Sequence, residues 1–558
     1  MEPPESIKVS EGETGSEGKP VKVDAPSAKD PGDPRTIRGL QLYLVIAALF
    51  CGVFVMALDE TIISTAVPKI TTEFKSLSDI AWYGSGYLLT ITAFQPTFGK
   101  LYRFVDNKLV FMTCVLIFEV GSILCASSPS STVFIVGRAI AGTGAAGLFQ
   151  GALAVITKTV ELQKRPLFIG IITSTFAISV SIGPVIGGVF SDKVTWRWCF
   201  WINVPIGGVV LVLIFFLLHL PTSSQESTFN SMTLPQKLWS LDPLGSVFII
   251  SAVVSILLAL QWGGTSMPWH SATVIGLLTA FPVLLGLFCF TQWKLGENAT
   301  LPLALLHEQS LMAAVVYCFF FSVPTYVYGY YISIYFQAAK GFTATESGTR
   351  FLAFALPQVI FLVVSGALVT LSGFYVPIIM IGTAIALIAS GLILLYNLET
   401  PVALWASVLV ICGIGTGSAV TLPYTIVQAT LVDDDVPTGN AALQFVFQLG
   451  AALSLSISQS IFLGQLKEYA KELTPFIPYD GLVAAGASNL RAIAETDQDY
   501  NLLRQVYMGA LHKTYFYPVV AIGLALLTTF AMEHRNIKNI RKERVDKDKP
   551  QPSTIKES

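Results

Sequence analysis

Four charged side chains stand inside runs of apolar residues that are long enough to cross a bilayer. Asp59 and Glu60 lie in VFVMALDETIISTAVP, Glu119 lies in LIFEVGSIL, and Arg138 lies in IVGRAIAGTG. A charged side chain at the centre of a membrane helix costs at least about 2.5–3.5 kcal/mol on insertion scales, so each one needs a partner or a function. Burial favours the protonated form of a carboxyl group, so the chemistry open to these carboxyls is to bind and release protons.

Depth along each helix indicates which of these charges meet. At about 1.5 Å per residue, Glu119 lies near the midplane, whereas Asp59 and Arg138 lie at similar depths in the outer half. We therefore predict an Asp59–Arg138 ion pair. The pair is either a static packing device, or Arg138 holds Asp59 ionised until protonation releases it. Glu119 is either a protonated carboxyl bonded to a neighbouring helix or a second coupling group.

An aromatic stripe marks the span near 311–336. Its members recur at spacings of three, four and seven residues, which is one helix face: Tyr317, Phe321, Tyr328, Tyr331 and Tyr335. Tyrosine hydroxyls that face lipid lack partners, so this face is expected to point at protein or at a substrate cavity. Helix packing with an interfacial belt is an equal alternative. Gln444 and Gln448, one turn apart, could line the same cavity.

The composition places these spans in a membrane protein. Of the 558 residues, 53% are hydrophobic and only 13% are charged, whereas a soluble domain carries roughly 25% charged residues. Too little polar surface remains to cover a water-facing protein of this size, so we expect many membrane spans. The polar segment 1–38 lacks an apolar core, which favours a disordered tail over a signal peptide.

Cysteine and histidine give no sign of a cofactor. The seven cysteines all lie in apolar runs and form no CxxC pair, which favours buried thiols over disulfides. The five histidines lie at the ends of apolar runs, which argues against a haem or a redox metal in the membrane. The sequence contains no nucleotide-hydrolysing motif. We expect no cofactor, no metal and no nucleic-acid partner.

Fourteen apolar runs have about the 18–25 residues that cross a hydrocarbon core of about 30 Å. They lie near 41–62, 80–101, 109–127, 132–156, 167–190, 198–219, 242–261, 271–292, 311–336, 351–371, 375–396, 402–425, 440–463 and 514–532. Lys and Arg collect in alternate loops if both termini are cytoplasmic. Asn298 begins the one sequon, NAT, in a loop that this topology places in the cytoplasm, so we expect no glycan there.

We predict an all-α membrane protein whose fourteen helices form two six-helix bundles, related as parallel repeats, with two helices inserted between them. Glycine-rich stretches in spans four and twelve suggest the repeat, and secondary transporters are often built this way. The expected parts are a disordered cytoplasmic tail, an N-terminal bundle, a linker with spans seven and eight, a C-terminal bundle with a long outer segment at 464–512 that lies against the membrane, and a basic cytoplasmic tail. They span 1–38, 39–220, 221–310, 311–533 and 534–558.

Four motifs in order resemble the major facilitator superfamily, and in particular its fourteen-span drug:proton antiporters and the fungal toxin and mycotoxin efflux pumps. LDETIISTAVPKI (58–70) is similar to the span-one motif, and GRAIAGTGAAG (137–147) resembles the span-four motif with its buried arginine. GPVIGG (183–188) resembles the antiporter motif of span five, and WRWCFWINVPIG (196–207) resembles a stretch typical of the fourteen-span branch. The resemblance extends over nearly all of the spans.

The antiporter-like motif places helix breakers inside a span. The resemblance implies that Gly183, Pro184, Gly187 and Gly188 bend span five and pack it against a neighbour. Pro184 removes a backbone donor, and Gly183 and Gly187 form a GxxxG step that permits close helix approach. Such packing would seal the outer half of a pathway when the carrier faces inward. The alternative is an ordinary kink without a coupling role.

One loop departs from the resemblance. The family usually carries a G-x-L-A-D-R pattern between spans two and three, but residues 99–108 read GKLYRFVDNK. Arg103 stands at the position of the aspartate, and Asp106 is displaced. The charge relay of the family cannot be carried over, so the gating role of this loop is unassigned.

Residues and resemblance together predict a proton-coupled efflux transporter, not an enzyme. It would export small hydrophobic compounds such as secondary metabolites, toxins or drugs by alternating access, as in multidrug resistance and mycotoxin export. Asp59, Glu119 and Arg138 are the coupling residues in this hypothesis. A siderophore or other small-molecule carrier of the same superfamily is the alternative. The sequence lacks the like-charge rings and filter repeat of a channel. We expect a monomer in the bilayer of the plasma membrane, with the vacuolar membrane as the alternative.

Overall fold

The computed structural model describes residues 39–74, 79–220, 224–263, 267–296, 299–301, 308–475, 477–479, 481–482, 486 and 490–540, and these are helical almost throughout. Thirteen helices in this part of the chain are long and apolar enough to cross a membrane. The N-terminal half contains α1 (Leu40–Phe74), α2 (Ile80–Phe104), α3 (Asn107–Ser127), α4 (Ser131–Thr159), α5 (Arg165–Lys193), α6 (Trp198–Trp201) and α7 (Asn203–Leu217).

The remaining helices include two short polar ones, α8 (Ser224–Ser231) and α9 (Leu234–Ser240), followed by the apolar helices α10 (Pro243–Trp262) and α11 (Ala272–Leu295). The C-terminal half contains α13 (Gln309–Ile334), which continues as the π-helix η3 (Tyr335–Ala339), and then α14 (Ala344–Ser372), α15 (Val376–Ile393), α16 (Val402–Ala419), α17 (Leu422–Thr430), α18 (Val436–Leu473), α20 (Leu490–Ile493) and α21 (Asp497–Thr529).

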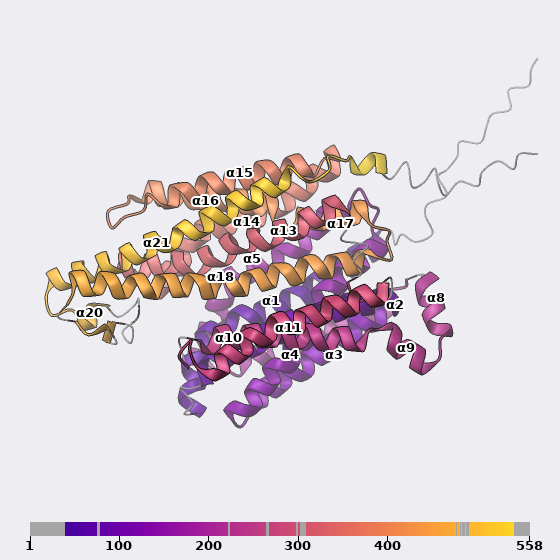
Figure 1. Ribbon diagram of the computed structural model, residues 1–558, viewed down its shortest axis with the longest axis horizontal. Helices are drawn as coiled ribbons and strands as arrows, with labels where there is room; N and C mark the ends of the chain where they lie inside the picture. Colours follow the sequence, from indigo (N-terminus) through magenta and orange to yellow (C-terminus); the bar gives the residue numbers. More distant parts are fainter. Residues whose placement is uncertain are drawn as a thin grey trace, which may run out of the picture.

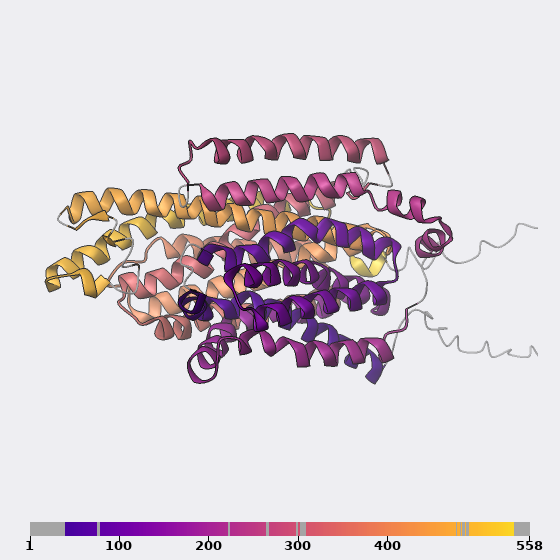
Figure 2. The same cartoon turned by 90° about the horizontal axis from the view of Figure 1, so that it is seen from below.

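The helices form two bundles that lie side by side (Figure 1). Helices α1–α7 pack among themselves, and so do α13–α21. Two seams join the bundles: α5 packs against α14, and α2 packs against α18. The pair α10–α11 attaches to the outside of α2, and Figure 2 shows α11 as the outermost layer. Only 11% of the apolar window of α11 is buried inside the protein, as expected for a helix that faces lipid on most sides.

Helix α2 is not among the thirteen apolar helices, although its range matches the predicted span at 80–101. At 25 residues it is about 37 Å long, which is enough to cross a bilayer. Polar residues lower its hydropathy, and the side chains of Thr92, Gln95 and Lys100 are buried between neighbouring helices. Composition alone therefore supports thirteen spans in the described residues.

Both described ends of the chain lie at one end of the bundles, here called the terminal end; the other is called the opposite end (Figure 1). Near the start of α1, the side-chain amide of Gln41 donates to the carbonyl oxygen of Leu217, 2.7 Å away. After α21, the backbone N–H of Glu533 donates to the hydroxyl of Ser310, 3.0 Å away. Each half of the chain therefore begins and ends at the terminal end. Asn298 and the segment 1–38 lie outside the described residues.

The segment 464–512, which we expect to lie against the membrane, begins and ends within two long helices. Helix α18 runs for 38 residues to Leu473, and α21 begins at Asp497. Most of the segment therefore continues these two helices, which pack against each other and project at the opposite end, at the left of Figure 1. A membrane helix can extend beyond the bilayer when a neighbouring helix covers its apolar face.

A buried carboxylate fixes the inserted pair of helices. Asp242 has a left-handed backbone conformation with φ of 51°, and its side chain is 1% exposed. It accepts hydrogen bonds from the backbone N–H of Gly245 at 2.7 Å, from the amide of Gln292 at 2.8 Å and from the hydroxyl of Thr300 at 2.8 Å. The start of α10 is thereby tied to the end of α11.

Candidate functional site

A buried ion pair lies at the centre of the N-terminal bundle. The guanidinium of Arg138 on α4 donates through Nη1 to Oδ2 of Asp59 on α1, and the two side chains are 1% and 0% exposed. This confirms the pairing that depth predicts. Arg138 is also held independently of Asp59, because its Nε donates to the carbonyl oxygen of Tyr83, 2.9 Å away, and its guanidinium lies 4.3 Å from the ring centroid of Tyr87.

Asn203 on α7 is the second partner of Asp59, and the sequence reasoning missed it. Its amide Nδ2 lies 3.2 Å from Oδ1 of Asp59 and 3.1 Å from the hydroxyl of Ser122 on α3. Asn203 belongs to WRWCFWINVPIG, a motif whose resemblance to the family indicates no chemical role for this residue. A polar side chain inside an apolar span was the available signal, as it was for Glu119.

The same motif braces α1 at the opposite end. Trp196 Nε1 donates to Oε2 of Glu73 on α1 at 2.6 Å, and Arg197 Nη2 donates to Oε1 at 2.9 Å. Arg197 also donates to the carbonyl oxygen of Ser128, between α3 and α4, at 3.0 Å. Residues 196–203 therefore hold α1 at two levels, one beside the ion pair and one at the helix end.

Glu119 lies close to the ion pair, one helical turn along α3 from Ser122. Its side chain is 7% exposed, and neither carboxyl oxygen has a hydrogen-bond partner among the described residues. Gly207 on α7 leaves room for it, because a Cβ added there would collide with the Glu119 carboxyl. A buried ionised carboxylate without a partner is costly, so this environment suits a protonated carboxyl.

Glu60, the neighbour of Asp59, lies within electrostatic range of Arg138 and Asp59. Its side chain is partly exposed, and Tyr326 and Tyr330 on α13 of the C-terminal bundle also lie within its electrostatic range. Within the described residues we find no hydrogen bond or ion pair to its carboxylate. Tyr326 donates to Oε1 of Gln448 on α18 at 2.9 Å, and Tyr330 is 59% exposed.

The predicted aromatic stripe lies inside the C-terminal bundle. Its five members are at most 5% exposed: Tyr317, Phe321, Tyr328, Tyr331 and Tyr335. The hydroxyl of Tyr317 is 2.8 Å from that of Thr383 on α15, and the Tyr331 ring is 5.5 Å from the Phe462 ring on α18. These contacts are of the kind that helix packing makes, and Tyr326 and Tyr330 lie on an adjacent face of α13.

The two glutamines of α18 have aromatic partners. Gln448 accepts from Tyr326, as described above, and Gln444 accepts from the hydroxyl of Tyr424 on α17. Both amide side chains are 6% exposed. They therefore contact the helices of their own bundle in this conformation, with Gln448 at the edge of the surface that carries Tyr326.

The antiporter-like motif lies in a continuous helix, because α5 is helical from Arg165 to Lys193. At Gly183 the motif contacts α1 of its own bundle: a Cβ added there would overlap with Thr61, whose hydroxyl donates to the carbonyl oxygen of Ser179 at 3.0 Å. Gly187 is also buried, whereas a Cβ at Gly188 would meet open space. The close approach at Gly183 is therefore within one bundle.

The closest contacts between the bundles lie at the terminal end. A Cβ at Gly170 of α5 would overlap with the carbonyl oxygen of Leu362 on α14, and one at Gly366 of α14 would overlap with that of Pro166. On the other seam, a Cβ at Gly99 of α2 would overlap with Ala441 of α18. Only glycine allows backbones to approach so closely.

Two ion pairs join the bundles beside these contacts. Arg103, which belongs to the atypical stretch 99–108 and lies in the last turn of α2, is 2.8 Å from Asp435 at the start of α18. Arg165 binds Asp433 through both terminal nitrogens, each at 3.1 Å. The charge of Arg103 is opposite to that of the family aspartate, and its partner on the other bundle is acidic. The terminal end is closed by these contacts.

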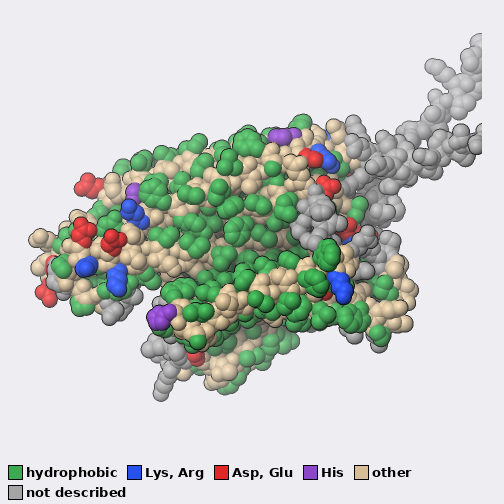
Figure 3. Space-filling model, viewed as in Figure 1, with side chains coloured by type: hydrophobic (Ala, Val, Ile, Leu, Met, Phe, Trp, Pro, Cys, Tyr) green, Lys and Arg blue, Asp and Glu red, His purple; other side chains and the backbone are tan. Residues whose placement is uncertain are grey.

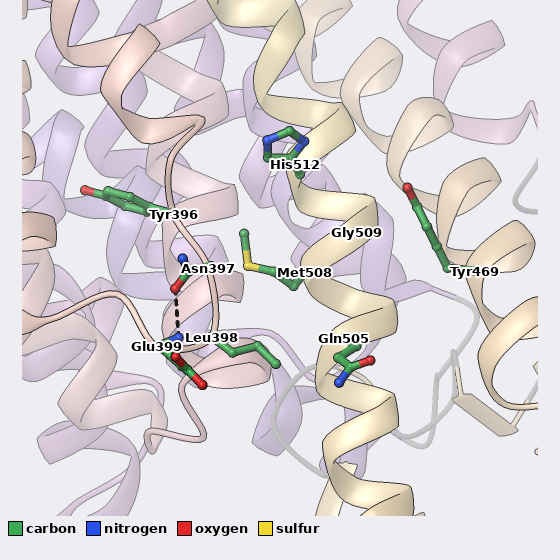
Figure 4. A pocket seen from close by; sticks show the side chains of 9 residues that line it. All are labelled: Tyr396, Asn397, Leu398, Glu399, Tyr469, Gln505, Met508, Gly509 and His512. Atoms are coloured by element: carbon green, nitrogen blue, oxygen red, sulfur yellow. Dashed lines mark hydrogen bonds between the residues drawn. The ribbon is translucent and has the colours of Figure 1, made fainter.

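At the opposite end the C-terminal bundle projects beyond the rest of the protein, which leaves a step in the outline at the left of Figure 3. A separate pocket of about 500 Å³ lies within the projecting part of the C-terminal bundle, between the loop after α15 and the helices α18 and α21. Figure 4 shows Tyr396, Glu399, Tyr469 and His512 around it. It lies outside the seams between the bundles, and nothing in its lining indicates a ligand.

Comparison with known proteins agrees with this architecture. Residues 49–455 match the family model described as Major Facilitator Superfamily. The chain is 36% identical to the MFS-type efflux pump MFS1 of Trichophyton rubrum, over 94% of this chain and 98% of the relative. It is 38% identical to the efflux pump aflT of Aspergillus parasiticus, over 90% and 98%, and 37% identical to the efflux pump roqT of Penicillium rubens, over 94% and 97%.

Solved structures of the same kind share the fold. The proton:xylose symporter XylE superposes with a TM-score of 0.55 at 11% sequence identity, over 89% of this chain and 98% of that chain. The human organic anion transporter MFSD10 gives a TM-score of 0.54 at 13% identity, over 86% and 100%. At such low identity these likenesses concern the fold alone.

Proposed function

Because the chain belongs to the major facilitator superfamily of membrane transporters, we propose that it exports small hydrophobic compounds in exchange for protons. Its relatives named as efflux pumps support the direction of transport. The observation that carries the proton coupling is the buried cluster of Asp59, Arg138, Asn203 and the unpartnered Glu119. Asp59 is ion-paired, whereas Glu119 has an environment that suits the protonated form. The two carboxyl groups can therefore take up protons at different steps of the transport cycle.

The orientation proposed here has the terminal end in the cytoplasm, with fourteen spans if α2 is counted, arranged as two repeated six-helix bundles. The cationic loops support it, since Arg103, Lys108, Lys158 and Arg165 all lie at the terminal end. The closed terminal end then makes this conformation outward-facing. The plasma membrane is the proposed location, because export from the cell requires it.

The surface proposed to meet the substrate lies between the bundles, where Glu60 on α1 faces Tyr326 and Tyr330 on α13, with Gln448 beside them. Aromatic rings offer a flat apolar contact, and their hydroxyls offer hydrogen bonds. Such a surface recognises shape and apolar area rather than one defined group, as suits small hydrophobic compounds.

The decisive experiment measures protons and compound together. The purified protein is reconstituted into vesicles that contain a pH-sensitive dye, and rhodamine 6G and the neutral dye Nile red serve as probe compounds. For an exchanger, adding a transported compound accelerates the collapse of an imposed pH gradient, and the gradient drives accumulation of the compound. Accumulation that ignores the pH gradient would reject proton coupling, and the absence of flux for both dyes and for a wider panel of apolar compounds would reject the export function.

A further inference from the structure

The amide of Asn203 is bonded at one end only. Its Nδ2 donates to Oδ1 of Asp59 at 3.2 Å and to the hydroxyl of Ser122 at 3.1 Å, which uses both amide hydrogens. Its carbonyl oxygen Oδ1 is buried without a partner among the described residues, and the side chain is 0% exposed. An unused acceptor at such a site is costly, by roughly the desolvation of one polar group.

The chemistry of the carboxyl group explains why an amide suits this place. An ionised Asp59 can only accept hydrogen bonds, whereas a protonated Asp59 carries a hydroxyl that donates one. An asparagine amide has a donor end and an acceptor end of nearly equal shape, and Ser122 can donate or accept by rotating its hydroxyl. Turning the amide over therefore keeps both hydrogen bonds and reverses their direction.

We propose that Asn203 is a positioning residue that follows the protonation state of Asp59: its amide donates to the ionised carboxylate and, turned over, accepts from the protonated carboxyl. This inference rests on the proposed proton coupling at Asp59. Arg138 is also held by its bond to the Tyr83 carbonyl and by its place over the Tyr87 ring. Neither contact involves Asp59, so protonation of Asp59 alters the Asn203 contact without removing the arginine's other supports.

Asn203 contacts residues on two other helices, so turning its amide changes hydrogen bonds to both of them. Asp59, Ser122 and Asn203 come from α1, α3 and α7, and they meet at one level of the N-terminal bundle. Glu119 and Gly207 lie about one turn away, on α3 and α7 respectively, where the carboxyl and the glycine are in contact. A change of direction at Asn203 therefore acts next to the second buried carboxyl.

Other titratable groups face Asp59 and have to be accounted for in any test. They include one cation, Arg138 on α4, and two further carboxyl groups, Glu60 on α1 and Glu119 on α3. The remaining ones within electrostatic range are uncharged at neutral pH: Tyr87 on α2, Cys125 on α3 and Cys199 on α6.

The test titrates Asp59 directly by infrared spectroscopy of the full-length protein in lipid between pH 4 and 9. The protonated-carboxyl band that is present in the wild type and absent in Asp59→Asn belongs to Asp59. In Asn203→Leu, a variant with a side chain of similar branching, the ionised carboxylate loses a charge-assisted bond, whereas the protonated form loses a weaker neutral one. We expect the midpoint of the band to rise by about half to one pH unit.

Two controls distinguish a role of Asn203 in hydrogen bonding to Asp59 from a role in packing: the variant Asn203→Ser, and Asn203→Leu combined with Asp59→Asn. Asn203→Ser keeps a group that can donate or accept, so it should move the midpoint less than Asn203→Leu; if Asn203→Leu does not fold, Asn203→Ala takes its place. The difference spectrum of Asp59→Asn against Asp59→Asn/Asn203→Leu should lack the shift. An unchanged midpoint in Asn203→Leu, or a shift that persists without Asp59, overturns the inference. A wild-type midpoint outside the titrated range, about pH 4–9, also overturns the inference. Absence of proton–compound exchange in the vesicles refutes the proposed function instead.

Discussion

At the scale of the residue, neighbours in the sequence have opposite environments. Successive residues of a helix point about 100° apart, so Asp59 is fully buried in its ion pair while Glu60 is partly exposed. The sequence predicts the Asp59–Arg138 pair, because depth needs only a count along each span. It does not predict Asn203 or the direction of Glu60, because both depend on how helices rotate about their axes. A stripe such as Tyr317–Tyr335 likewise defines a face but not what covers it.

The first prediction concerns Asp59. Asp59→Asn keeps the shape of the side chain and can still accept from Arg138, but it cannot take up a proton. We expect the variant to reach the membrane and to lose pH-driven accumulation of the probe compound, measured in the vesicle assay. Glu119→Gln is measured beside it under the same conditions. Normal pH-driven transport by Asp59→Asn would exclude this residue and leave Glu119 as the coupling group.

The second prediction concerns Glu60, whose carboxylate has no cation paired with it in the described residues. In its ionised form, a carboxylate beside aromatic rings favours a positively charged compound over a neutral one of similar size. We expect Glu60→Gln to raise the KM for rhodamine 6G by about tenfold, since a hydrogen bond to a charged group contributes about 1.5 kcal/mol or more. Transport of Nile red should change little. Equal losses for both dyes would show that Glu60 is needed for folding or coupling rather than for charge recognition.

At the scale of the element, α5 has two different neighbours along its length. Near its start, Gly170 meets α14 of the other bundle, and farther along, Gly183 meets Thr61 of α1. The sequence motif predicts a close approach in span five, but it cannot name the partner, because a glycine only permits contact. The contacts of Gly170 and Gly366 carry no motif, and only the structure reveals them.

The third prediction uses two glycines of the same motif. Leucine at Gly183 must displace Thr61 or separate α5 from α1, and overpacking of this kind costs about 1–3 kcal/mol or more. Leucine at Gly188 meets open space. We expect Gly183→Leu to lower the thermal unfolding temperature of the purified protein and its transport rate, while Gly188→Leu remains close to the wild type in both. Similar behaviour of the two variants would mean that the motif does not act through this packing.

At the scale of the whole molecule, two ion pairs and several close glycine contacts join the two bundles at the terminal end. The sequence predicts the bundles and their order, because apolar runs and cationic loops are local features. It does not predict which end is closed, since closure depends on pairs such as Arg103–Asp435 that lie 332 residues apart by their numbering. The departure of the loop 99–108 from the family pattern is explained by its partner: an arginine there meets the acidic stretch Asp433–Asp435.

The last prediction tests that closure by exchanging charges. Arg103→Asp places a carboxylate against Asp435, and replacing an attractive contact of 2.8 Å by a repulsive one at a partly buried site should favour the open terminal end by about one decade or more in population. The measurement is the distance between spin labels on the terminal ends of α2 and α18, which should lengthen. The double variant Arg103→Asp/Asp435→Arg restores opposite charges and should return the short distance.

Lys164→Glu is the matched control, because Lys164 pairs with Glu161 of its own bundle at 3.5 Å. This variant should leave the distance between the spin labels unchanged. If the double variant stays as open as Arg103→Asp, the ion pair is not what holds the bundles together, and the glycine contacts of the two seams would have to close the terminal end by themselves.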